Sequence, residues 1–134
     1  MNFTSPDIKT LEKNQIFVFG SNYAGQHGKG AALLAMRKFG ARRGQGMGLM
    51  GQSYGIATKG HRLDVLSLRE IEVQCDRFKR YALAHPEFEF LVTEIGCGLA
   101  GYRPKDIAPF FVDSPSNVVL PEAFWKVIKP DLFS

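Results

Sequence analysis

Short apolar runs alternate with helix-like segments along the chain, and this alternation constrains the fold more than any other feature. Apolar or alternating runs predict strands over residues 15–19, 52–58, 88–95 and 117–120. Helix-favouring segments predict helices over residues 29–39, 67–85, 104–111 and 121–128. Strands joined through helices pair in parallel, because the crossover returns the chain to the same edge of the sheet. We therefore predict an α/β fold with a mostly parallel central sheet and helices on both faces.

Capping signals mark several of these boundaries. Ser67 and Glu70 form the Ser-x-x-Glu pattern of a capping box, in which each side chain satisfies a free backbone amide of the first turn. Gly40 suits the end of the first helix, and Pro104 suits the first turn of a later one. Residues 41–51 contain four glycines, so we expect a flexible loop there.

The composition indicates one globular domain that folds without a disulfide or a structural metal. A length of 134 residues suits a single domain over 1–134, and the polar residues 1–15 predict no regular element. Eleven phenylalanines and a hydrophobic fraction of 45% supply core material. Cys75 and Cys97 match neither a disulfide framework nor a zinc site, and the three histidines are scattered. We expect neither a metal nor a cofactor.

Charge and targeting features favour a cytoplasmic protein with anionic partners. The net charge is +4, which favours anionic ligands without naming one. The beginning of the sequence shows no basic segment followed by an apolar one, so no secretory signal is expected. No apolar run reaches the length of about 20 residues that a membrane span needs. The sequence does not predict the oligomeric state.

Two glycine-rich loops each join a predicted strand to a predicted helix. The first spans residues 20–30, and in the second Gly96, Gly98 and Gly101 match the pattern G-x-G-x-x-G. Missing Cβ atoms let the backbone approach an oxygen-rich ligand, and free amides at a helix start point toward it. Both loops are expected at the carboxyl edge of the sheet, where ligands of such folds bind. Together they predict a diphosphate ligand, although the glycines of either loop alone could equally form tight turns.

Two common nucleotide-binding motifs do not fit. A Rossmann dehydrogenase carries its glycine fingerprint at the first strand, whereas the match here comes late in the chain. Residues 46–51 match the same pattern before a strand, so the pattern alone is weak. A P-loop needs Ser or Thr after its Gly-Lys pair, but Gly30 follows Lys29.

The residues of both loops resemble a macrodomain, the module that binds ADP-ribose. Residues 21–32 resemble the first ligand loop of that family, and residues 94–102 resemble its diphosphate loop. The segment Ile-Gly-Cys-Gly-Leu over 95–99 is particularly similar to the terminal ADP-ribose protein glycohydrolase class and to related antitoxins that remove ADP-ribose from DNA. The resemblance covers roughly residues 16–120. It implies a three-layer α/β/α fold, a site for ADP-ribose or a related nucleotide, and ADP-ribosylated protein or nucleic acid as partners.

The resemblance also implies roles for individual positions. Lys59 ends the segment 56–59 and matches the lysine with which the glycohydrolase class attacks the anomeric carbon of the distal ribose, so it is the expected catalytic residue. The residues themselves leave other roles open. Lys59 could be a solvated lysine at a strand end, and Asn22 could be a turn residue. His27 could be an exposed loop histidine, and Tyr102 could be a core aromatic. The expected ligand-binding residues are Ser21, Asn22, His27, Gly28, Gly30, Gly96, Cys97, Gly98, Leu99, Ala100, Gly101 and Tyr102.

One departure from the family leaves the activity open. The glycohydrolase class has an acidic residue directly after Gly-Cys-Gly-Leu, where this chain has Ala100. That acid helps to expel the leaving group and to resolve the covalent adduct, and the nearest substitutes in sequence are Glu94, Asp106 and His27. The chain is therefore expected either to hydrolyse ADP-ribose from a macromolecule or to bind it without turnover. A basic nucleic-acid-binding protein is a further alternative, and no residue clearly matches the aspartate with which many macrodomains read adenine.

Overall fold

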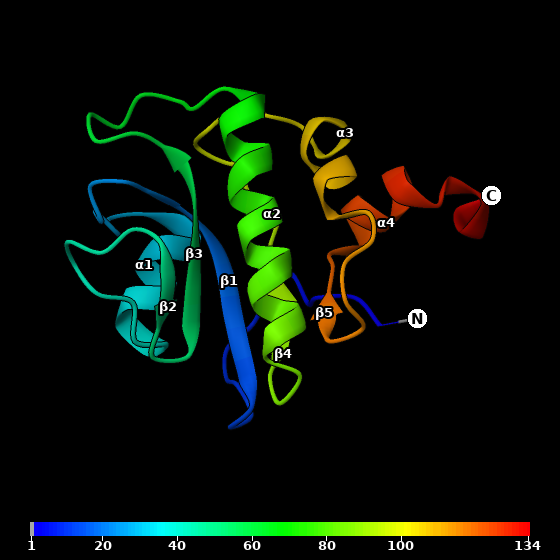
Figure 1. The fold of residues 1–134 in the computed structure, drawn as a ribbon, viewed down its shortest axis with the longest axis horizontal. Helices are drawn as coiled ribbons and strands as arrows, with labels where there is room; N and C mark the ends of the chain where they lie inside the picture. Colours follow the sequence, from blue (N-terminus) through cyan, green and yellow to red (C-terminus); the bar gives the residue numbers. More distant parts are fainter. Residues whose placement is uncertain (1) are drawn as a thin grey trace.

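The computed structural model describes residues 2–134 as an α/β fold on a five-stranded mixed sheet (Figure 1). The central strand is β1 (Gln15–Asn22), and the order across the sheet is β2-β3-β1-β4-β5. β1 pairs in parallel with β3 (Ser53–Lys59) and with β4 (Glu89–Val92), and β4 pairs in parallel with β5 (Val118–Val119). The edge strand β2 (Gly48–Met50) runs antiparallel to β3.

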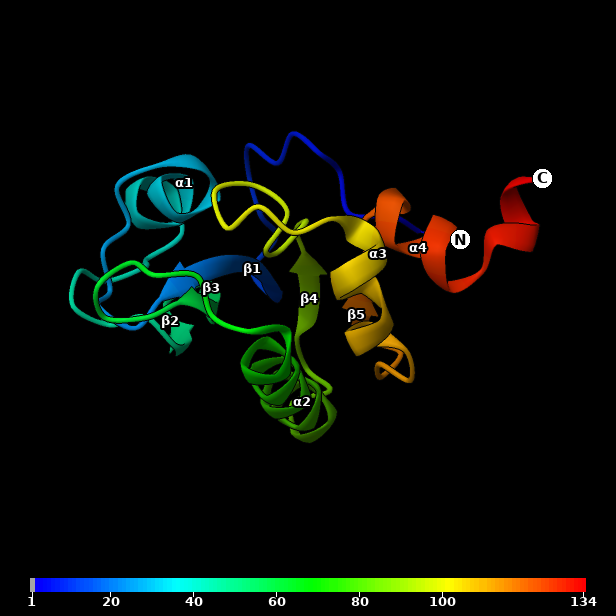
Figure 2. The same ribbon diagram turned by 90° about the horizontal axis from the view of Figure 1, so that it is seen from above.

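Helices cover both faces of this sheet. α1 (Gly30–Lys38) lies on one face and α2 (Leu68–Ala84) on the other (Figure 2). α3 (Pro104–Ile107) continues directly as the 3-10 helix η1 (Ala108–Phe111), which packs against α2. The last helix, α4 (Glu122–Ile128), follows β5 and leads into a second 3-10 helix over 130–133. Among the described residues, no helix combines the length and apolar character needed to cross a membrane.

Two buried clusters hold the helices to the sheet. Ile16 and Val18 of β1 join a cluster with residues of α2, whereas Phe17 and Phe19 join a cluster with residues of α1. Neighbouring residues of β1 face opposite sides of the sheet, as an extended strand requires. Because all four side chains are at most 2% exposed, each contributes about 1.5–3 kcal/mol through burial.

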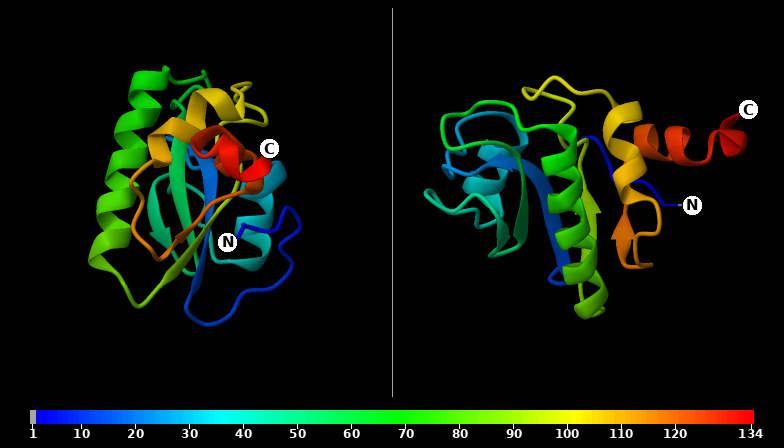
Figure 3. Two further views of the ribbon diagram at one scale, coloured as in Figure 1. Left: turned by 90° about the vertical axis from the view of Figure 1, so that its right-hand side faces the viewer. Right: turned by 45° about the horizontal axis from the view of Figure 1, so that its top comes forward.

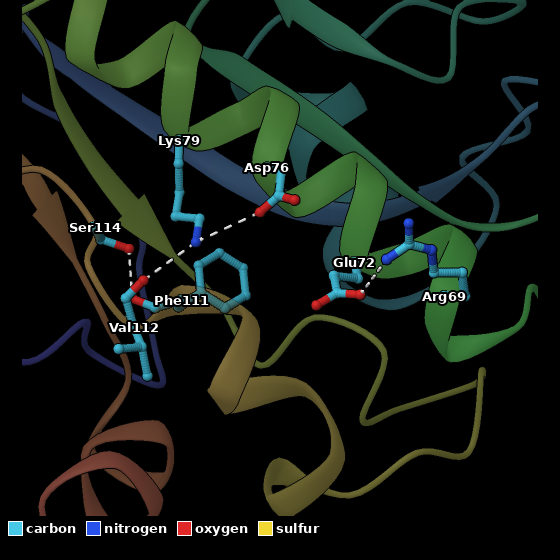
Figure 4. A network of polar contacts seen from close by, with 7 residues as sticks. All are labelled: Arg69, Glu72, Asp76, Lys79, Phe111, Val112 and Ser114. Carbon is cyan, nitrogen blue, oxygen red and sulfur yellow. Dashed lines mark hydrogen bonds and ion pairs between the residues drawn. The ribbon is translucent and has the colours of Figure 1, made fainter.

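Lys79 of α2 ties this helix to the turn after η1 (Figure 4). The Nζ of Lys79 donates a 3.1 Å hydrogen bond to the carbonyl oxygen of Val112 and lies 3.6 Å from a carboxylate oxygen of Asp76. The hydroxyl of Ser114 donates to the carbonyl of Phe111 at 2.7 Å. These contacts fix the short helical segment that follows the second glycine loop.

The beginning of the described chain crosses the α1 face of the sheet as an irregular segment. Residues 2–14 form no helix or strand beyond a single parallel bridge between Thr4 and Pro121. The Thr4 amide donates to the carbonyl of Leu120 at 2.9 Å, and Ile8 packs against the cluster under α1. Phe3 stacks on Phe133 with ring centroids 5.9 Å apart, so the two ends of the described part of the chain lie together beside α4 (Figure 3).

The structure confirms the alternation of strands and helices and the capping box of Ser67 and Glu70. The expectation of a flexible loop over 41–51 is wrong for residues 48–50, because β2 forms there by pairing with β3. This antiparallel strand makes the sheet mixed. β1 also continues past Gly20 to Asn22, because Gly20 and Ser21 remain paired with β3.

The buried thiol of Cys75 makes stability depend on pH in the alkaline range. Burial raises the pKa of this thiol from its ordinary value of 9.0 to about 12 in the folded protein. The unfolded chain therefore loses this proton near pH 9 while the folded chain keeps it, so the stabilisation is complete below pH 9 and is lost between pH 9 and 12. We expect the free energy of unfolding, measured with urea, to fall by about 1.4 kcal/mol per pH unit in this range. The Cys75→Ala variant should not show this fall. Equal slopes for both proteins would contradict this assignment.

Candidate functional site

A cavity of about 490 Å³ opens beyond the carboxyl ends of the three central strands. Its size is typical of small-molecule sites, which range from about 300 to 1,000 Å³. Four parts of the chain line it: the ends of β1, β3 and β4, the segment that leads into the first turn of α1, Leu63 after β3, and four residues of the loop 96–101. The cavity thus lies where the two glycine loops were expected to meet.

Sheet topology brings the two glycine loops side by side. β1 and β4 are neighbours, so the loops that follow them leave the same edge of the sheet. A Cβ atom placed on Gly20 would lie 3.5 Å from the amide nitrogen of Gly96. Gly96 has a φ of +76° and sits against Ile107, so the left-handed conformation and the close packing both favour glycine here.

The first loop presents the uncapped start of α1 to the cavity. The N-cap residue Lys29 makes no side-chain capping bond, and the first turn carries no acidic residue. The amides of Gly30, Ala31 and Ala32 therefore lack partners within the helix, and these three residues line the cavity. A helix start with free amides favours an anion.

The second loop presents a row of amides to the same cavity. Within it, the Gly101 amide donates to the carbonyl of Gly98 at 3.0 Å, and the Tyr102 amide donates to that of Gly96 at 2.9 Å. Among the described residues, no acceptor pairs with the amides of Gly98, Leu99 and Ala100, and these residues line the cavity. Successive unpaired backbone amides in a turn are a common way for proteins to bind an anion.

Lys59 lies at the end of β3 and lines the cavity. It is opposite Asn22 in the β1–β3 pairing, and its carbonyl accepts a 3.0 Å hydrogen bond from the Tyr23 amide. The hydroxyl of Thr58 donates to the carbonyl of Ser21 at 3.2 Å, which fixes the strand end. The half-buried Lys59 side chain therefore projects from a well-anchored backbone.

Nine of the thirteen residues expected at the site line the cavity. The four that are not among its lining residues are His27, Cys97, Gly101 and Tyr102. The nine that line it are Ser21, Asn22, Gly28, Gly30, Lys59, Gly96, Gly98, Leu99 and Ala100.

The side chains of Asn22 and Tyr102 are occupied by contacts within the protein. The Asn22 Nδ2 donates to the carbonyl of Gln26 at 2.8 Å, and its Oδ1 accepts from the Gln26 amide at 2.9 Å. Asn22 therefore closes its own loop, as expected of a turn residue. The Tyr102 hydroxyl donates to the carbonyl of Leu66 at 2.7 Å while the ring packs against the α2-side cluster, as expected of a core aromatic.

His27 is buried beneath the first loop, whereas the alternative to ligand binding was an exposed histidine. Its side chain is 3% exposed and its Nε2 lies 2.9 Å from the carbonyl oxygens of both Arg42 and Gln45. Because carbonyls only accept, Nε2 carries the proton and holds the segment 42–45 against the loop.

Substitution of His27 should therefore act on stability. We expect His27→Phe to lower the free energy of unfolding by about 1–2 kcal/mol, because two carbonyls lose their donor. Chemical denaturation of the two proteins measures this effect. Unchanged stability together with lost ligand binding would instead show that the ring acts on the ligand.

The protonation of Cys97 and the positions of the nearby acidic residues determine which proton transfers are possible in the cavity. Burial, followed by the charges of Glu94 and Asp106, raises the pKa of the Cys97 thiol to about 11, so this cysteine is a neutral thiol at pH 7. The Asp106 carboxylate accepts from the Arg103 amide at 3.0 Å and caps α3. Glu94 is the acidic residue among those that line the cavity.

Sequence reasoning missed several lining residues, including Thr58, Leu63 and Thr93. Thr58 lies at the carboxyl end of β3 and Thr93 directly follows β4, so their position at this edge was the available signal. Leu63 is 42% exposed and has a φ of +62°, which is an unusual conformation for leucine. No sequence pattern marks that conformation.

Within residues 2–134, no group of three or more His, Cys, Asp and Glu side chains could hold a metal ion. Protein-family models, curated proteins and solved structures were all compared with the chain, and none of them matches it.

Proposed function

We propose that this protein binds ADP-ribose, or a closely related nucleotide, in the cavity at the carboxyl edge of its sheet. The proposal includes a macrodomain-like, three-layer α/β/α arrangement. The observation that carries it is that two separate sets of free backbone amides, at 30–32 and 98–100, line one cavity. A diphosphate group has two anionic centres and fits such a pair of anion sites.

The charges around the cavity favour the same ligand. Lys29 and Lys59 both line it, whereas Glu94 is its acidic lining residue. The amides are fixed by the sheet and by the loop hydrogen bonds, so they need little reorganisation when an anion binds. In the proposed mode the diphosphate lies between the two amide sets, and the distal ribose lies at the Lys59 end.

The proposed activity is hydrolysis of ADP-ribose from a modified macromolecule. The deprotonated Nζ of Lys59 attacks the anomeric carbon of the distal ribose, the bond to the macromolecule breaks, and the leaving group takes up a proton. Opening of the sugar then gives a Schiff base, which water hydrolyses to release ADP-ribose and restore the amine. Glu94 is the acid in the cavity that is available for these proton transfers.

The second candidate function is binding without turnover. Ala100 stands where the glycohydrolase class has its acid, and its methyl group transfers no proton. Tight binding of ADP-ribose, with no release of it from modified protein or DNA, would identify the protein as a non-catalytic binding module.

Calorimetric titration tests the ligand class directly. ADP-ribose should bind with much higher affinity than ADP, NAD or inorganic phosphate, because only ADP-ribose places both a diphosphate and a free distal ribose in the cavity. Affinity for nucleic acid that falls steeply with salt and ignores added ADP-ribose would favour a nucleic-acid-binding protein instead.

A further inference from the structure

The turn that follows β3 carries a leucine back to the cavity. The Gly60 amide donates to the carbonyl of Asp64 at 2.8 Å, and the Leu63 amide donates to that of Gly60 at 3.1 Å. An isolated antiparallel bridge pairs Lys59 with Val65 and closes the turn at its base. Within the turn, Leu63 is the residue that lines the cavity. The turn therefore brings an apolar side chain to the cavity from the strand end that carries the candidate nucleophile.

The backbone of Leu63 adopts an unfavourable conformation to reach this position. Its φ of +62° lies in the left-handed region, where the Cβ atom of a leucine crowds the backbone and glycine is favoured. Its side chain remains 42% exposed, so contacts within the protein use only part of its apolar surface. Unfavourable backbone conformations that persist in folded proteins are concentrated at ligand sites. The conformation and the exposure together point to a contact with the ligand.

Contacts on both sides of the turn hold Leu63 in place. On one side, His61 packs against Tyr23 of the first glycine loop, with ring centroids 5.5 Å apart. On the other side, the carbonyl of Leu66 accepts a 2.7 Å hydrogen bond from the hydroxyl of Tyr102, which follows the second glycine loop. The turn is thus anchored to both loops, and the Leu63 side chain needs little reorganisation when a ligand binds.

We propose that Leu63 is a specificity-determining residue, whose side chain packs against the distal ribose and so favours ADP-ribose over nucleotides that end at the diphosphate. The inference rests on the proposed binding of ADP-ribose with its distal ribose at the Lys59 end of the cavity. A ribose presents C–H groups as well as hydroxyls, and their contact with an aliphatic side chain removes apolar surface from water. The same contact holds the sugar beside Lys59.

Leu63→Gly tests this role, because glycine removes the side chain and favours a φ of +62°. Calorimetry should show an affinity for ADP-ribose about 10-fold below that of the wild type, and an affinity for ADP within about 2-fold of it. The retained ADP binding shows that the variant is folded. Leu63→Met keeps a flexible apolar side chain and should keep most of the preference for ADP-ribose.

Asp113→Gly is the matched control. Asp113 is the other non-glycine residue with a positive φ among residues 2–134, and it lies in the turn after η1, outside the lining of the cavity. Its replacement should leave both affinities unchanged. Unchanged ADP-ribose affinity in Leu63→Gly, or an equal loss of affinity for ADP-ribose and ADP, would overturn the inference. Failure of the proposed function looks different, because the wild-type protein would then bind neither nucleotide.

Discussion

Replacement of Gly98 by valine should weaken the binding of ADP-ribose about 100-fold, or roughly 2.7 kcal/mol, without lowering the melting temperature. Gly98 lines the cavity, its φ lies outside the left-handed region, and a Cβ atom there would meet no atom within 4 Å. The folded protein can therefore accept a side chain at this position. The added methyl groups occupy the space in which we place the diphosphate.

Gly28 provides an independent position for the same experiment. It also lines the cavity, and a Cβ atom there would likewise meet nothing within 4 Å. Gly28→Val should therefore reduce the affinity in the same way, whereas Ala84→Val at the exposed end of α2 should not. Unaltered ADP-ribose affinity in both folded glycine variants would place the ligand elsewhere.

Lys59→Ala should reduce the release of ADP-ribose from modified protein or DNA on the order of 10³-fold, while free ADP-ribose still binds within about 10-fold of the wild type. The substitution removes the proposed nucleophile but leaves both sets of amides intact. Single-turnover release assays measure the rate, and calorimetry measures the binding.

Lys29→Ala is the matched control for this experiment. Lys29 also lines the cavity, but it lies at the start of α1, so its loss should weaken binding and leave the rate at saturation unchanged. Borohydride reduction during turnover should add the mass of the ligand to Lys59. Equal rates of ADP-ribose release by Lys59→Ala and the wild type would exclude the lysine mechanism. Absence of release by the wild type would favour binding without turnover.

The sequence predicted most elements of this fold because their signals are local. The continuous apolar run of β1, the capping box at Ser67 and the glycine after α1 each depend on neighbouring residues. β2 was missed because its three residues become a strand only through pairing with β3. The Gln45 side chain also donates to the carbonyls of Met47 and Leu49, a contact that no local pattern indicates.

The candidate site was predicted where it depends on the backbone and not where it depends on side-chain direction. Parallel pairing of β1 and β4 brings Gly20 and Gly96 together, so the topology places both glycine loops at one edge. The orientation of His27 depends on the carbonyls of the segment 42–45, which follow it across α1. A second cavity joins residues 3–8 with residues 121–126, which are too far apart in the chain for any sequence pattern to connect.

The participation of both sets of amides can be followed directly by titrating ¹⁵N-labelled protein with ADP-ribose in ¹H–¹⁵N correlation spectra. We expect the largest shift changes to fall together on the amides of residues 30–32 and 98–100 and to saturate with one common dissociation constant. Changes confined to one of the two turns, or centred outside the cavity, would contradict this expectation.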